Sequence, residues 1–424
     1  MNFTVRADRR LIRPGHRSKR HVLARVTAPE QRREHPRPPV NVAFVLDRSG
    51  SMGGQKIALA RQAVNRAVEG LDPRDRFAVV VYDDQIDVLV ESTAASGEAK
   101  RMVLGRLAAT DARGSTNLAD GWLRGCEQVG AHLDGETVGR CLLLTDGLAN
   151  VGITDPVELE HHARELRNRG VATSTFGVGA DFDEALLRRM ANEGGGNFYF
   201  IEHAVQIPDL IASELGEALD VVVRDAILEI ETDPRVRVEP LTWKRAESHE
   251  GLTQIMLGDL ESAQMLDIVL RLGFPYGALG GTVRATVRLR DRDGLLPSMP
   301  EKLVFEFASD EVNDTQPRDR EIDRLVASLE AAKAREAAIQ YNRLGEYDQA
   351  ERRLAGVARK ILAYAGNDPE LLAIAGELQR EAGQFSREVR EMDRKKLYFS
   401  ASNVASMRGP QGQAIRNRPP QGPH

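Results

Sequence analysis

The sequence predicts a doubly wound α/β domain with a mostly parallel sheet, flanked by a β-sandwich and a C-terminal α-helical region. Short, almost wholly apolar runs alternate with amphipathic segments between residues 40 and 219. Strand-like runs divided by Gly, Pro and Asp follow to about residue 310, and segments rich in Ala, Leu, Glu and Arg come after residue 317. Alternating strand and helix patterns favour a parallel sheet, whereas consecutive short strands favour a sandwich.

Length and composition narrow the class of protein. A chain of 424 residues corresponds to about three domains at roughly 150 residues each. Hydrophobic residues at 42% and charged residues at 29% exclude wholesale disorder and collagen-like repeats. No apolar run approaches the ~20 residues of a membrane-spanning helix, and the charged start MNFTVRADRR is unlike a signal peptide. We therefore expect a cytoplasmic protein with no membrane span.

Charged and sulfur-containing residues exclude further classes. The 49 arginines are offset by 63 acidic residues, so we expect no nucleic-acid partner. Met1–Pro39 nevertheless carries a net charge of +8, which suits either an acidic partner or a solvated strand edge that discourages edge-to-edge pairing. Cys126 and Cys141 are too few for a disulfide framework or a zinc knuckle, and we expect both to be small buried hydrophobic residues.

The first part of the chain predicts one strand and then the α/β domain. Residues 20–27 alternate as a strand does, and a Pro-rich connector places a boundary near Pro39, so residues 1–39 are expected to join the sandwich. Residues 40–219 form the α/β domain, because strands covered by helices on both faces appear as continuous apolar runs. Its strands are predicted at 41–46, 77–82, 140–145, 171–179 and 197–200, and its helices at 57–69, 97–108, 118–132, 157–169, 184–192 and 207–219.

The second half of the chain predicts two further regions. The sandwich spans 220–310, with strands at 221–231, 236–241, 252–257, 265–272 and 283–290. Helices occupy 317–400 and are broken at Gly345 and at Gly366–Pro369. The segment YNRLGEYDQAERRL is similar to one tetratricopeptide hairpin, but no second copy follows at a fixed period. Residues 408–424, rich in Pro, Gly and Gln, are expected to be disordered.

Oxygen-bearing side chains follow three of the predicted strands of the α/β domain. Asp47, Ser49 and Ser51 come directly after the first strand, Thr116 precedes a helix, and Asp146 ends a later strand. Singly, each of them could be a helix cap or a turn residue. Together they lie at carboxyl ends of strands, where ligand sites of such sheets form. Carboxylates and hydroxyls are hard donors, which suit Mg²⁺, Mn²⁺ or Ca²⁺ better than zinc or copper.

Residues 40–219 resemble a von Willebrand factor type A domain, and DRSGS at Asp47–Ser51 matches its metal-ion-dependent adhesion site motif. The resemblance implies a Rossmann-like fold and a Mg²⁺ held by the hydroxyls of Ser49, Ser51 and often Thr116, with Asp47 and Asp146 acting directly or through water. One coordination position would remain for an Asp or Glu of a partner protein.

The resemblance extends beyond the motif. VVYDDQIDVLV is similar to the family's second strand and its antiparallel edge strand, and it leaves Asp83 as either an outer contributor to the site or a turn residue. The flanking regions resemble bacterial proteins in which a β-sandwich and helices surround such a domain. That layout is distantly like the inter-alpha-trypsin inhibitor heavy chains and the calcium-activated chloride channel regulators.

Motifs for other chemistries fail or have simpler interpretations. GSMGGQKI lacks the second Gly and the Ser or Thr of a P-loop, and no G-x-S-x-G surrounds Ser49 or Ser51. His161 and His162 are about 100° apart on a helix, and EGGGN at 193–197 is a permissive turn. We therefore expect a metal-dependent protein-binding scaffold and no enzyme. A metal-assisted hydrolase and an accessory subunit of an AAA+ ATPase remain as alternatives.

Overall fold

The computed structural model describes residues 2–30, 37–296 and 299–417 of the chain. They fall into two compact units: Arg32–Val221 form one, and Met1–Gln31 with Val222–His424 form the other. The sandwich and the helical region, which the sequence divides into separate domains, thus share a unit with the N-terminal segment. No helix in the described ranges is long and apolar enough to cross a membrane.

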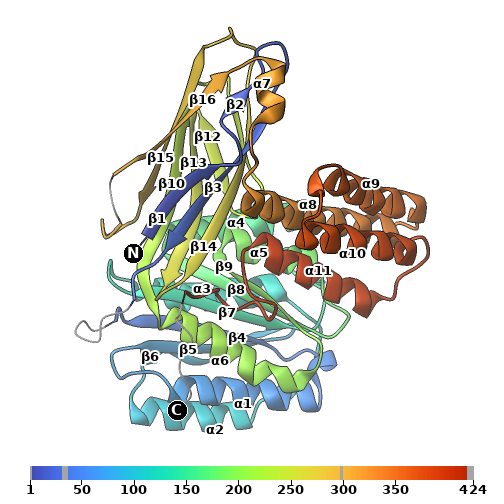
Figure 1. The fold of residues 1–424 in the computed structure, drawn as a ribbon. Helices are drawn as coiled ribbons and strands as arrows, with labels where there is room; N and C mark the ends of the chain where they lie inside the picture. Colours follow the sequence, from blue (N-terminus) through green and yellow to red (C-terminus); the bar gives the residue numbers. More distant parts are fainter. Residues whose placement is uncertain (1, 31–36, 297–298, 418–424) are drawn as a thin grey trace, which may run out of the picture. The chain divides into compact units, whose positions relative to one another are not determined.

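The unit Arg32–Val221 contains the predicted α/β sheet (Figure 1). Its six strands lie in the order β6-β5-β4-β7-β8-β9. All neighbours are parallel except β6, which runs antiparallel to β5 and is the predicted edge strand. The strands are β4 (Val40–Asp47), β5 (Arg76–Tyr82), β6 (Ile86–Ala94), β7 (Val138–Thr145), β8 (Val171–Val178) and β9 (Gly195–Ile201). The predicted doubly wound α/β fold is confirmed.

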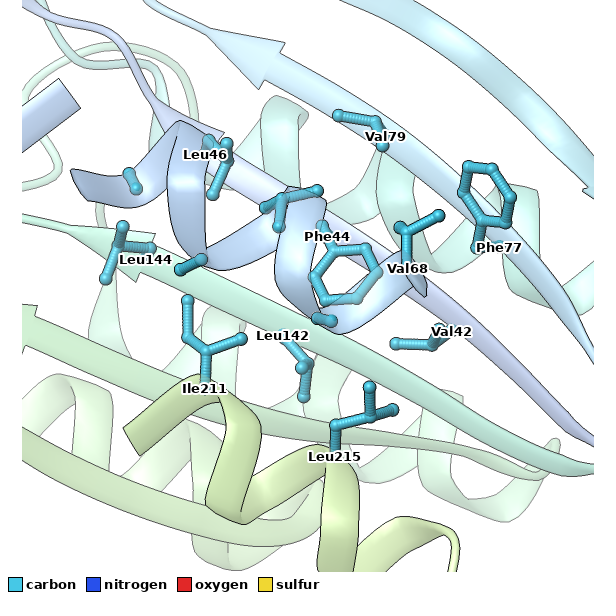
Figure 2. Close-up of a cluster of buried hydrophobic side chains, with 14 of the residues drawn as sticks. Val42, Phe44, Leu46, Val68, Phe77, Val79, Leu142, Leu144, Ile211 and Leu215 are labelled. Carbon is cyan, nitrogen blue, oxygen red and sulfur yellow. The ribbon is translucent and has the colours of Figure 1, made fainter. Parts of the chain in front are cut away.

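Helices cover both faces of this sheet. One face carries α1 (Gln55–Glu69), α2 (Gly97–Ala108) and α6 (Ile207–Ala218), and the other carries α3 (Leu118–Gly130), α4 (Pro156–Asn168) and α5 (Glu184–Glu193) (Figure 1). Figure 2 shows the core on the first face, where apolar side chains of β4 and β7 meet those of α1 and α6. Backbone pairing holds the carboxyl ends of β4 and β7 side by side, and the chain at those ends carries four of the five predicted site residues, Asp47, Ser49, Ser51 and Asp146.

The other unit contains a two-sheet sandwich. One sheet has the order β1-β3-β14-β11 and the other has the order β12-β13-β10-β15-β16-β2. The N-terminal strand β3 pairs with β14, so the N-terminal segment is part of the sandwich. The strands are β1 (Asn2–Ala7), β2 (Leu11–Ile12), β3 (Lys19–Thr27), β10 (Val221–Thr232), β11 (Arg237–Pro240), β12 (Ala246–His249), β13 (Leu252–Glu261), β14 (Met265–Gly273), β15 (Thr282–Arg290) and β16 (Glu301–Phe307).

The prediction of a disordered tail is wrong for residues 408–417. The backbone N–H of Met265 donates to Ile415 at 2.8 Å, and the N–H of Asn417 donates to Ala263 at 2.9 Å. The tail therefore hydrogen-bonds to the turn between β13 and β14. Composition misses this contact because backbone groups make it, and their donors are independent of side-chain type. Residues 418–424 lie outside the described part of the chain.

The helical region follows the sandwich and packs on it. It consists of α7 (Asp310–Thr315), α8 (Arg320–Arg343), α9 (Tyr347–Ala365), α10 (Pro369–Phe385) and α11 (Glu391–Ala405). Helix α9 packs on α8 and α10, and α11 packs on α8. Gly345 and Gly366, at the predicted breaks, have φ values of 75° and 56°, which favour glycine. Ile322 and Leu329 of α8 share a buried cluster with Leu23 and Val269 of the sandwich.

The basic N-terminal segment meets acidic residues of its own unit. Arginines of the first strands form ion pairs with carboxylates that lie mostly on α7 and at the start of α8. The pairs include Arg6–Asp319 at 2.9 Å, Arg13–Asp310 at 2.7 Å, Arg25–Asp267 at 2.6 Å and Arg25–Glu321 at 2.7 Å. Three of the eleven basic residues of this segment are thus paired with acids of their own unit, and both interpretations of the charge, the acidic partner and the solvated strand edge, stay open.

Candidate metal site

The carboxyl ends of β4 and β7 bring the two predicted aspartates together. Asp47 is the last residue of β4, and Asp146 directly follows β7. The two strands are parallel neighbours, with Leu46 opposite Leu144. Two carboxylates 99 positions apart in the sequence therefore lie at the same edge of the sheet.

The two serines connect these carboxylates. Ser51 donates its hydroxyl to Oδ1 of Asp146 at 2.6 Å, and the hydroxyls of Ser49 and Ser51 are 3.1 Å apart. The backbone N–H of Ser49 donates to Oδ1 of Asp47 at 2.7 Å. Four of the five predicted site residues thus form one continuous hydrogen-bonded chain.

Thr116 reaches the same place from a third loop. Its Oγ1 lies 3.3 Å from the position that a Cβ on Gly147 would occupy, so the hydroxyl lies directly beside the residue after Asp146. Its backbone N–H donates to Oδ1 of Asn150 at 3.2 Å, and the N–H of Asn150 donates back to its carbonyl at 3.4 Å. The structure therefore groups all five predicted residues.

Two further residues of the site were missed by the sequence reasoning. Thr145 donates its hydroxyl to Oδ2 of Asp47 at 2.7 Å. The ammonium of Lys56, in the first turn of α1, contacts Oδ2 of Asp146 and the carbonyl of Ser51. Lys56 lies five positions after Ser51, and Thr145 lies one position before Asp146. A search for metal-ligating oxygens in loops passes over both, because Lys56 has no side-chain oxygen and Thr145 lies in a strand.

The site has two buried carboxylates and fewer positive charges to compensate them. Asp47 is 0% exposed and Asp146 is 1% exposed. Burial raises the pKa of Asp47 to about 6, although hydrogen bonds from Ser49 and Thr145 act in the opposite direction. The contacts of Asp47 within the described chain come from neutral donors, and Lys56 provides one positive charge for two carboxylates. A divalent cation would offset the remaining negative charge, and the hard oxygen donors fit Mg²⁺ or Ca²⁺.

Asp83 is a turn residue with two arginine partners. Its Oδ2 accepts from Nε of Arg48 at 2.9 Å and from Nε of Arg113 at 2.8 Å, while Oδ1 accepts from the N–H of Gln85 at 2.6 Å. Burial alone would raise its pKa, but these partners lower it below the ordinary value. Asp83 therefore stabilises the loops around the site and directs both of its oxygens to these groups.

The other polar candidates lie elsewhere. Cys126 and Cys141 are free, buried thiols. His161 and His162 lie on α4, with ring centroids 6.2 Å apart. The described residues contain no group of three or more His, Cys, Asp or Glu that could hold a metal, so a metal at the candidate site would depend on the hydroxyl donors.

Comparison with known sequences assigns this part of the chain to a family. Residues 41–213 match the model of the von Willebrand factor type A domain. The uncharacterized protein YfbK of Escherichia coli is 32% identical over 207 residues, which are 48% of this chain and 36% of YfbK. Human inter-alpha-trypsin inhibitor heavy chain H4 is 32% identical over 164 residues, which are 37% of this chain and 18% of that protein. The chain thus spans about a third or less of these relatives.

Solved structures extend the similarity in fold to the flanking regions. A von Willebrand factor type A protein from Catenulispora acidiphila has a TM-score of 0.74 at 17% identity, covering 98% of this chain and 97% of that one. The ArnB paralog VWA2 from Sulfolobus acidocaldarius has a TM-score of 0.56 at 17% identity, covering 92% and 99%. Residues 41–213 of this chain are therefore a von Willebrand factor type A domain within a fold of three regions.

Proposed function

We propose that this protein is a non-enzymatic scaffold that binds a partner protein through a divalent cation. The observation that carries the proposal is the joining of two buried carboxylates and two serine hydroxyls from separate loops at one sheet edge. Domains of this family generally mediate metal-dependent protein interactions. When bound, a Mg²⁺ would supply an electrophilic centre for a partner's Asp or Glu, and Mn²⁺ or Ca²⁺ fits the same donors.

Each residue has a distinct task in this proposal. Ser49, Ser51 and Thr116 would hold the cation with their hydroxyls, and Asp47 and Asp146 would supply negative charge directly or through water. Thr145 orients the carboxylate of Asp47, and Asn150 fixes the loop that carries Thr116. Lys56 compensates the negative charge of Asp146 while no cation is bound.

Calorimetric titration of Mg²⁺ and Mn²⁺ into the full chain tests the metal site. We expect Asp47→Ala to lose binding, because it removes one of the two buried carboxylates. Asp72→Ala is the matched control, since Asp72 is 55% exposed and lies between α1 and β5, at the opposite edge of the sheet. Unchanged metal affinity in Asp47→Ala would refute the proposal.

Partner capture requires a separate test. Wild type and Asp47→Ala are used as baits in Mg²⁺ and in chelator. A partner that wild type captures in Mg²⁺, and that is lost both in chelator and with Asp47→Ala, supports metal-dependent binding. Metal-dependent phosphoester turnover by the wild type that Asp47→Ala abolishes would instead support a hydrolase. A changed rate of a co-purifying AAA+ ATPase would support an accessory subunit.

A further inference from the structure

The loop between β7 and α4 carries aliphatic side chains next to the metal site. Leu148 is 55% exposed, Val151 and Ile153 are half-buried, and Val157 at the start of α4 is 71% exposed. A single exposed aliphatic residue is ordinary on a protein surface, but Leu148 lies two positions after Asp146, in a segment with three more aliphatic side chains that are at least partly exposed. We call residues 148–157 the aliphatic loop.

Hydrogen bonds attach this loop to the metal site on either side of Leu148. Gly147, just before Leu148, donates its N–H to the Thr145 hydroxyl at 3.2 Å, and Asn150, two residues later, exchanges hydrogen bonds with Thr116. Leu148 therefore lies between two anchored positions on the rim of the metal site. Leu148 is thus an exposed apolar residue two positions after Asp146.

The remainder of the aliphatic loop is held in a defined conformation. Gly152 has a φ of 74°, and a Cβ there would lie 2.6 Å from Oδ1 of Asn117, the residue after Thr116. Asp155 caps α4 by accepting the N–H groups of Val157 and Glu158. These contacts restrict the backbone of the loop on either side of Ile153, which lowers the entropic cost of binding.

We infer that the aliphatic loop selects the partner of the metal site, and that the partner presents a carboxylate flanked by a bulky apolar side chain in a short exposed segment. The inference rests on the proposed function. A cation by itself binds every accessible carboxylate, so selectivity needs a second contact beside it. Leu148 offers that contact, because covering its exposed surface removes apolar area from water, whereas a polar flanking residue gains nothing there.

A peptide library tests this inference on the full chain. Displayed linear peptides carry a fixed central Asp or Glu with randomised flanks and are selected in Mg²⁺ by wild type, Leu148→Asn, Leu148→Met and Leu344→Asn. Leu344, at the C-terminus of α8, is 72% exposed and belongs to the other unit, so its variant is the matched control. We expect wild type, Leu148→Met and Leu344→Asn to enrich apolar flanks.

Leu148→Asn should lose the selectivity for flanking residues and should still bind the metal. Leu148→Asn should enrich no flank and should bind the peptides selected by wild type about tenfold more weakly. Its Mg²⁺ affinity by calorimetry should match that of the wild type, which also shows that the site is folded. Random or charged flanks in the wild-type selection, no retained peptide, or wild-type affinity in Leu148→Asn would overturn the inference. Failure of the proposed function appears differently, as selection that persists in Asp47→Ala or in chelator.

Discussion

Ser51 donates its hydroxyl to Oδ1 of Asp146 at 2.6 Å, although the two are 95 positions apart in the sequence. The contact exists because β4 and β7 are adjacent parallel strands whose carboxyl ends coincide. It joins the turn before α1 to the loop before α4, and the second of these loops also carries the aliphatic surface. A bound metal and a selective apolar contact would therefore be held by the same two linked loops.

Replacing Lys56 should strengthen metal binding. The ammonium of Lys56 contacts Asp146 and would repel an incoming divalent cation. We expect Lys56→Met to bind Mg²⁺ about tenfold more tightly at low ionic strength, measured by calorimetry. Lys100→Met, whose ammonium contacts the carbonyls of Glu69 and Leu71, is the control. Weaker binding by Lys56→Met would show that the lysine mainly orients Asp146.

Removing the Thr145 hydroxyl should destabilise the metal-free protein. Its hydrogen bond to buried Asp47 is made to a charged acceptor, and the isosteric Thr145→Val leaves that oxygen without this donor. The free energy of unfolding of the α/β unit should fall by about 2 kcal/mol in urea denaturation with chelator present. Thr93→Val on the edge strand β6 should change it by less than about 0.5 kcal/mol. Equal effects in the two variants would contradict the role assigned to Thr145.

The Asp75 carboxylate should stabilise the α/β unit at neutral pH and lose that effect in acid. Burial alone would raise its pKa, but hydrogen bonds from Arg37 and from the N–H groups of Val40 and Asp72 outweigh burial and lower it. A lowered folded pKa gives stability that is complete above the unfolded value, near 4, and is lost as pH falls through the folded value. Asp75→Asn should cost about 3 kcal/mol at pH 7.

Urea denaturation at two pH values checks this assignment. The difference in unfolding free energy between wild type and Asp75→Asn should be large at pH 7 and clearly smaller at pH 3. A difference of the same size at both pH values would mean that packing, and not the charge of Asp75, carries the effect.

Gly121 permits the close approach of α3 to β5. A Cβ at this position would lie 2.5 Å from Cγ of the buried Tyr82 ring. We expect Gly121→Ala to lower the unfolding free energy by about 2 kcal/mol or more, since both elements must move apart. Gly130→Ala, on the same helix with open space around its Cβ, should be neutral or stabilising by up to about 1 kcal/mol. Thermal unfolding measures the stability of both variants, and equal losses of stability would contradict the close contact between Gly121 and Tyr82.

The sequence predicted the strands whose apolar residues form a clear continuous run or a clear alternation. Strands β4, β5 and β7 are buried nearly throughout and appear as continuous apolar runs. Strand β16 was missed although its buried residues Leu303, Phe305 and Phe307 alternate with exposed, mostly charged ones, because the segment is short and follows a turn-rich stretch. Strand β12 is exposed along its whole length, so no apolar pattern marks it.

By itself, the sequence determined the α/β architecture and the oxygen donors Asp47, Ser49, Ser51, Thr116 and Asp146, because apolar periodicity and short-range spacing are local properties. Only the tertiary structure decided that Thr145 and Lys56 contact the two aspartates and that Asn150 holds the loop of Thr116. It also decided that Arg6, Arg13 and Arg25 pair with acids of their own unit and that residues 408–417 bind the sandwich. Contacts between distant segments depend on which strands are neighbours, and strand order follows from the packing of the whole core.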